Sequence, residues 1–171
     1  MNIHKIHDLS NTNVVSILKS GLKFSDEKNY SPYFFDINSN LFYILQHGRF
    51  IDGAYYVIEE DGKYIASAGW NRYNHNTALV LARAFVSKPY RTTYIMGEML
   101  LPLMLEECKN FENVWITCNE NNRAIYDWFE RSASGMKPTL FNNWPDIYKR
   151  FKPIGEMSIY YTQQLVAQLE R

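Results

Sequence analysis

Residues 79–133, LVLARAFVSKPYRTTYIMGEMLLPLMLEECKNFENVWITCNENNRAIYDWFERSA, decide the fold of this chain. Residues 79–86 (LVLARAFV) and 113–119 (NVWITCN) are short apolar runs typical of strands. Each is followed by a segment of helical character, 92–108 (TTYIMGEMLLPLMLEEC) and 120–131 (ENNRAIYDWFER). The first N–H groups of a helix lack a partner within the helix and lie at the positive end of its dipole. Two such turns side by side therefore predict a crevice for a long, phosphate-bearing cofactor.

The rest of the chain predicts a sheet that extends outward from this stretch. Asp61 and Gly62 favour a tight hairpin turn, because these residue types adopt positive φ angles readily. We expect strands at 2–8, 53–60, 63–70, 78–86, 113–119 and 155–164, and helices at 10–20, 38–46, 92–108 and from 122 onward. This order predicts an α/β (α+β) fold, a mixed and mostly antiparallel sheet with helices on both faces.

Length, charge and cysteine usage narrow the class of protein. A chain of 171 residues predicts a single domain, residues 1–171. Its 18 basic and 18 acidic side chains argue against a nucleic-acid or anionic-membrane partner, and the N-terminus has no signal-peptide pattern, so we expect a cytoplasmic protein. Cys108 and Cys118 are predicted to be buried free thiols. His4, His7 and His47 lack metal-ligand spacing, and no metal site is expected.

A motif at the first strand-to-helix turn resembles a known family. Val86, Pro89 and Arg91 have the order and spacing with which the GNAT-type N-acetyltransferases end their fourth strand and open the next helix. Residues 121–125 (NNRAI) match the family's Asn-x-x-Ala-Ile signature on the helix after the fifth strand. The resemblance covers residues 53–133 and implies a GNAT-like sheet in which the parallel fourth and fifth strands splay apart.

This resemblance implies acetyl-coenzyme A as the co-substrate and names the residues that would bind it. The side chain of Arg91 and the N–H groups that follow it would hold the pyrophosphate. The backbone of Phe85 and Val86 would pair with the pantetheine arm, which the Asn121 amide would also contact. The residues of the pyrophosphate turn are Arg91, Thr92, Thr93, Tyr94, Ile95, Met96 and Gly97. Without the resemblance, Arg91 can also be interpreted as an ordinary surface arginine after a strand. Asn121 can be interpreted as the N-cap of the helix that is expected from 122 onward.

The chain departs from the family pattern at the chemical positions. Tyr94 and Met96 stand where the family has small residues that let the backbone approach phosphate. Trp128 stands where the family commonly has the tyrosine general acid, a role that an indole N–H cannot fill near neutrality. Tyr126 and Glu59 are the candidates that remain for the acid and the base, although Tyr126 is about 200° around a helix from Trp128.

Two readings of function follow. The resemblance implies an N-acetyltransferase that transfers the acetyl group directly to an amine, with a backbone N–H in the region 85–87 holding the oxyanion. The alternative is a non-catalytic GNAT-fold protein that binds acyl-coenzyme A or acts as a protein-interaction module. The acceptor would be a small-molecule or peptide amine chosen by the loops 23–52 and 133–153, and homodimer formation is left open.

Overall fold

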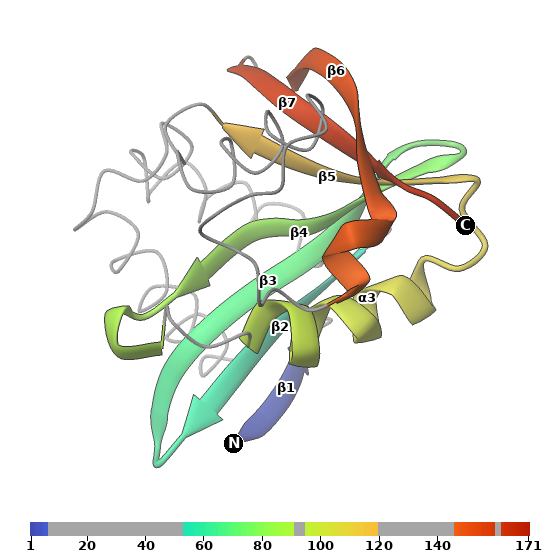
Figure 1. Cartoon of the computed structure of the whole chain (residues 1–171). Helices are drawn as coiled ribbons and strands as arrows, with labels where there is room; N and C mark the ends of the chain where they lie inside the picture. The colour runs from blue at the N-terminus through green and yellow to red at the C-terminus, as the bar shows by residue number, and fades with distance from the viewer. Residues whose placement is uncertain (7–52, 91–94, 120–145, 160–161) are drawn as a thin grey trace, which may run out of the picture.

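The computed structural model describes residues 1–6, 53–90, 95–119, 146–159 and 162–171. The strands of these residues form one seven-stranded mixed sheet with the order β1-β2-β3-β4-β5-β7-β6 (Figure 1). They are β1 (Asn2–Ile6), β2 (Gly53–Glu60), β3 (Lys63–Asn74), β4 (Thr77–Val86), β5 (Asn113–Asn119), β6 (Phe151–Ile159) and β7 (Thr162–Leu169). The helical segments are the 3-10 turns η2 (Lys88–Tyr90) and η5 (Asp146–Arg150), the π-helical η3 (Met96–Leu100) and α3 (Leu101–Glu107).

The first four strands form an antiparallel meander, as the sequence predicts. The turn between β2 and β3 has Asp61 at φ 50° and Gly62 at φ 74°, which confirms the predicted two-residue hairpin. β4 then pairs with β5 in parallel, so the chain must cross one face of the sheet between them, and it does so through η3 and α3 (Figure 1).

The prediction of one uninterrupted strand over 155–164 is wrong. Two antiparallel strands, β6 and β7, occupy this part of the chain, and β7 also pairs with β5. The residues between them in sequence are Tyr160 and Tyr161, which are not typical turn residues, so the sequence pattern did not show the break. The segment 133–153, expected to be a loop, contains η5 and the start of β6.

The predicted helix after β4 is irregular where the structure describes it. Met96–Leu100 is π-helical, and the Leu101 N–H donates to the Met96 carbonyl five residues earlier. Pro102 follows at the start of α3 and has no N–H to donate, so one ordinary i→i−4 bond is missing at this point. The helices predicted at 10–20, at 38–46 and from 122 onward lie outside the described residues. Within the described residues, no helix is long and apolar enough to span a membrane.

The two faces of the sheet bury different side chains. The larger of the two hydrophobic clusters, called the main core, lies between the sheet and α3 and includes Ala78 and Val80 of β4. Leu79 packs on the opposite face of the sheet with Trp115 and Val166. This alternation is the period-two pattern of a strand buried on both faces. α3 contributes its fully buried Leu101 and Met104 to the main core.

The two cysteines are buried free thiols, which confirms the sequence prediction. Burial, aided by the neighbouring Glu107 carboxylate, raises the pKa of the Cys108 thiol to about 12. We therefore expect neither cysteine to react with Ellman's reagent in the folded protein and both to react in guanidinium chloride, because the thiolate is the reactive form. Rapid reaction of one thiol per folded chain would contradict this prediction.

Candidate active site

β4 and β5 separate along their length. Their parallel pairing joins Thr77–Val80 to Asn113–Ile116 and ends there. β4 continues to Val86 along β3, while the last residues of β5 continue along β7. Two strand edges therefore face each other beyond the last parallel pair, and Figure 1 shows the two strands diverging. The predicted splaying of the fourth and fifth strands is confirmed.

A bulge at Leu81 is placed where the strands separate. Leu81 has φ 55°, in the left-handed region that is unfavourable for a leucine by about 1–2 kcal/mol. The pairing of β4 with β3 slips by one residue between Leu79 and Ala82. Val80 and Leu81 consequently both pack against the main core, although neighbouring residues of a regular strand face opposite ways. A bulge bends its strand, and this one lies next to the last residue of β4 that pairs with β5.

The Leu81 N–H donates to the sulfur of Met104, with a distance of 3.4 Å between the nitrogen and Sδ. Met104 is fully buried, and its side chain comes from α3, across the face of the sheet rather than along it. A buried N–H without any acceptor lowers the stability of the fold by about 1–3 kcal/mol, so this contact stabilises the bulge.

Backbone hydrogen bonds fix the end of β4 and the turn that follows it. The Ser87 N–H donates to the Ile65 carbonyl at 2.8 Å, and the Tyr90 N–H donates to the Ser87 carbonyl at 2.9 Å. Ser87 therefore uses its N–H within the sheet. Ser87 is excluded as the donor in the predicted oxyanion region 85–87, and the role of Phe85 and Val86 stays a prediction.

A side-chain contact ties the following turn to the far end of β2. The Tyr90 hydroxyl donates to Glu60 Oε2 at 2.5 Å. This hydrogen bond, with burial and the Glu60 charge as smaller causes, raises the pKa of Tyr90. Because Arg91 is the next residue, the contact holds the backbone that leads into the predicted pyrophosphate turn.

The predicted site residues fall partly within the described structure. Ile95 and Gly97 are buried at the start of the helical segment, and Met96 is half-buried against the main core. Met96 thus has a packing role that the sequence did not indicate. The residues whose positions lie outside the described structure are Arg91, Thr92, Thr93, Tyr94, Asn121, Tyr126 and Trp128.

Glu59 lies away from the separation of β4 and β5. Its Oε2 is 2.8 Å from Nε2 of His4 on the neighbouring β1, and β3 stands between its strand and β4. Its role as a general base stays a prediction.

Sequence reasoning did not find the group of donors around Glu107, the last residue of α3. Lys5, Tyr56 and Trp70, on β1, β2 and β3, all donate hydrogen bonds to its carboxylate. No local pattern could have indicated this group, because its members are far apart in the chain.

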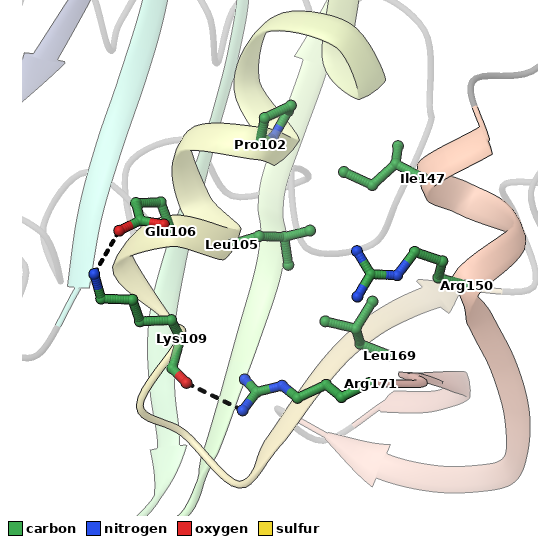
Figure 2. Close-up of a pocket in the computed structure, with 8 residues that line it drawn as sticks. All are labelled: Pro102, Leu105, Glu106, Lys109, Ile147, Arg150, Leu169 and Arg171. Carbon is green, nitrogen blue, oxygen red and sulfur yellow. Dashed lines mark hydrogen bonds and ion pairs between the residues drawn. The ribbon is translucent and has the colours of Figure 1, made fainter.

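A groove of about 440 Å³ lies between α3, η5 and the end of β7 (Figure 2). Two of its cationic side chains, those of Lys109 and Arg171, interact with other groups of the protein. Lys109 is paired with Glu106 at 2.5 Å, and the Arg171 guanidinium donates to the carbonyls of Cys108 and Lys109. The groove is lined by Pro102, Leu105, Glu106, Lys109, Ile147, Arg150, Leu169 and Arg171. None of these residues belongs to the separated edges of β4 and β5.

Comparison with known proteins identifies this arrangement. No protein-family model and no curated protein matches the chain. Solved structures match it over nearly its whole length, among them an acetyltransferase of the GNAT family from Staphylococcus aureus with a TM-score of 0.59, covering 99% of this chain and 100% of that one. The chain has the GNAT fold. The sequence identity to that structure is only 16%.

Other GNAT-fold structures agree. A ribosomal-protein-alanine N-acetyltransferase from Brucella melitensis has a TM-score of 0.58 at 14% identity, with 98% of both chains covered. A spermidine N-acetyltransferase from Vibrio cholerae has a TM-score of 0.59 at 12% identity, covering 99% of this chain and 94% of that one. Within the GNAT fold, the separated edges of β4 and β5 are the candidate active site.

Proposed function

We propose that this protein is an acetyl-coenzyme A-dependent N-acetyltransferase. The observation that carries the proposal is the separation of β4 and β5 beyond Val80 and Ile116 in a GNAT fold. An extended pantetheine arm can lie between two such edges and bond to backbone groups as an added strand would. Phe85 and Val86 lie on the β4 edge.

Each end of the cofactor has a proposed contact. Arg91 and the N–H groups of Thr92, Thr93, Tyr94, Ile95, Met96 and Gly97 would hold the pyrophosphate at the turn after β4. Asn121 would bond to the pantetheine arm from the segment that follows β5. These assignments rest on the order and spacing of the motif residues and on the position of β4.

The proposed reaction is direct transfer. The lone pair of a neutral amine attacks the thioester carbonyl, and an N–H of Phe85 or Val86 stabilises the oxyanion of the tetrahedral intermediate. Collapse of that intermediate breaks the carbon–sulfur bond and releases coenzyme A thiolate. The nitrogen loses one proton and the thiolate gains one, with Glu59 and Tyr126 as the candidate base and acid.

The acceptor is proposed to be a small-molecule or peptide amine. The fold neighbours are named for such substrates, spermidine and a ribosomal-protein alanine. The segments 23–52 and 133–153 are proposed to choose among amines, since loops rather than the sheet set specificity in a shared fold. A cytoplasmic location fits this chemistry.

A second candidate function is binding of acyl-coenzyme A without turnover. Three bulky residues favour it, because Tyr94, Met96 and Trp128 stand where the motif has small residues or the acid. Release of coenzyme A thiol with a panel of polyamines, amino acids and peptide amines separates an enzyme from a binder.

Acetyl-coenzyme A is expected to raise the melting temperature. A ligand at 100 times its Kd stabilises the folded state by about 2.7 kcal/mol, which corresponds to roughly 5–10 °C for a chain of this size. Arg91→Ala should weaken binding about tenfold, because one charge-assisted phosphate contact is lost. Differential scanning fluorimetry and calorimetry would measure both effects.

Arg150→Ala is the matched control, since this exposed arginine lines the groove of Figure 2 and not the β4 edge. It should leave cofactor binding unchanged. Absence of any shift at millimolar acetyl-coenzyme A would refute the proposed function.

Tyr90→Phe is expected to weaken acetyl-coenzyme A binding about threefold without changing the fold. The variant removes the hydroxyl that donates to Glu60, so the turn before Arg91 loses one restraint. Glu60→Ala in the Tyr90→Phe background should add little, because both changes remove the same contact. Equal and additive losses from the two substitutions would show that the contact does not position the turn.

A further inference from the structure

The bulge at Leu81 needs a positive φ, which is unfavourable for a leucine. Glycine adopts a positive φ without strain, but this position holds a leucine at φ 55°. Its N–H points to Met104 Sδ, 3.4 Å away. The sulfur therefore supplies the acceptor for the N–H at the point where β4 leaves β5.

Met104 suits this task by its shape and chemistry. Its unbranched side chain can extend from α3 to the sheet, and a thioether accepts a hydrogen bond while presenting an otherwise apolar surface to the core. Met104 is fully buried, so no solvent water competes for the Leu81 N–H from that side.

A β4 strand without the bulge would close the candidate active site. β5 continues for three residues beyond Ile116, from Thr117 to Asn119, and β4 continues to Val86. Without the bulge, β4 would keep its direction alongside these residues, and the two edges would pair with each other.

We propose that Met104 is a positioning residue of the cofactor site. Its sulfur holds the Leu81 bulge and thereby keeps the β4 and β5 edges apart for the pantetheine arm. Met104 itself contacts neither cofactor nor acceptor amine in this proposal. The part that concerns pantetheine rests on the proposed function, whereas the role in the bulge concerns the free protein.

Met104→Leu is the decisive variant, because leucine keeps the volume and apolar character of the side chain and removes the acceptor. Met99→Leu is its matched control, since Met99 also packs against the main core from the preceding helical segment. Amide hydrogen exchange of Leu81, followed by NMR in the absence of cofactor, reports the bulge. Calorimetry reports the Kd of acetyl-coenzyme A.

We expect slow exchange of the Leu81 amide in the wild type, at least tenfold faster exchange in Met104→Leu, and no change in Met99→Leu. Cofactor binding should weaken about tenfold in Met104→Leu and stay within about twofold in Met99→Leu. Near-ultraviolet circular dichroism checks that both variants keep their packing.

Fast exchange of the Leu81 amide in the wild type would overturn the proposal without any variant, even if Met104→Leu failed to fold. Unchanged exchange and unchanged binding in a folded Met104→Leu would overturn it as well. If the wild type bound no acetyl-coenzyme A, the proposed function would fail, and the exchange rates would still decide whether Met104 holds the bulge.

Discussion

Glu107→Ala is expected to lower the free energy of unfolding by about 2–3 kcal/mol, which corresponds to roughly 5–10 °C in melting temperature. The carboxylate accepts from Lys5, from the Tyr56 hydroxyl and, at 2.5 Å, from Trp70 Nε1. Truncation leaves the two aromatic donors without an acceptor at partly buried positions, and each orphaned donor carries a desolvation cost.

The three donors lie on three neighbouring strands, so Glu107 fastens the end of α3 to the sheet. Partial burial by itself would raise the pKa of Glu107, but the hydrogen bonds from Lys5, Tyr56 and Trp70 outweigh it and hold the pKa below its ordinary value. The pKa of the Tyr56 hydroxyl is raised, mainly by burial and in second place by its hydrogen bond to the Glu107 carboxylate.

Glu106→Ala is the matched control for chemical or thermal unfolding. Glu106 is the neighbouring residue of α3 but is exposed, and its contact is the surface pair with Lys109. Its truncation should barely change stability. Equal losses in the two alanine variants would show that the donors around Glu107 contribute nothing specific.

The contribution of Glu107 should also depend on pH in a predictable direction. A carboxyl group whose pKa is depressed in the folded state stabilises the fold above its ordinary pKa, and this stability is lost as the pH falls through the folded value. The stability difference between wild type and Glu107→Gln should therefore be constant above about pH 5 and shrink below pH 4.5. Urea unfolding at a series of pH values measures it.

Trp128→Tyr is expected to raise the rate of acetyl transfer about a hundredfold, the lower end of what a positioned general acid contributes. Trp128 occupies the position at which the resemblance implies a tyrosine acid. The wild type would release coenzyme A as the thiolate or through water, which a thiol pKa of about 8.5 permits near neutral pH, so its turnover should be slow.

Thiol release against the amine panel, for wild type and Trp128→Tyr in parallel, tests this expectation. Tyr126→Phe tests the other candidate acid: it should leave turnover unchanged if the acid position is at 128 and lower it if Tyr126 is the acid. A Trp128→Tyr protein that turns over more slowly than the wild type would refute the placement of the acid at this position.

Local signals in the sequence predicted most of the described strands. Asp61 and Gly62 marked the hairpin because their residue types favour the backbone angles that the turn needs. Short apolar runs marked β4 and β5, since both faces of the sheet are buried there. The closing hairpin was misread where its two strands are joined without a recognisable turn residue.

The candidate site was predictable only in part. The order of Val86, Pro89 and Arg91 along the chain indicated a cofactor turn after β4, because a strand followed by a helix places N–H groups at a fixed point of the sheet. The positive φ of Leu81 was not predictable, because leucine rarely adopts it and no neighbouring residue type marks a bulge.

The sequence by itself determined most of the strands, the hairpin turn and the resemblance to the GNAT motif, because each depends on residues that are close together in the chain. Only the tertiary structure decided where β4 and β5 separate and what supports that separation. The acceptor for Leu81 lies 23 residues away, and the donors to Glu107 lie 37 to 102 residues away. Contacts over such distances leave no periodic trace in the sequence, so they become visible only when the folded chain brings the partners together.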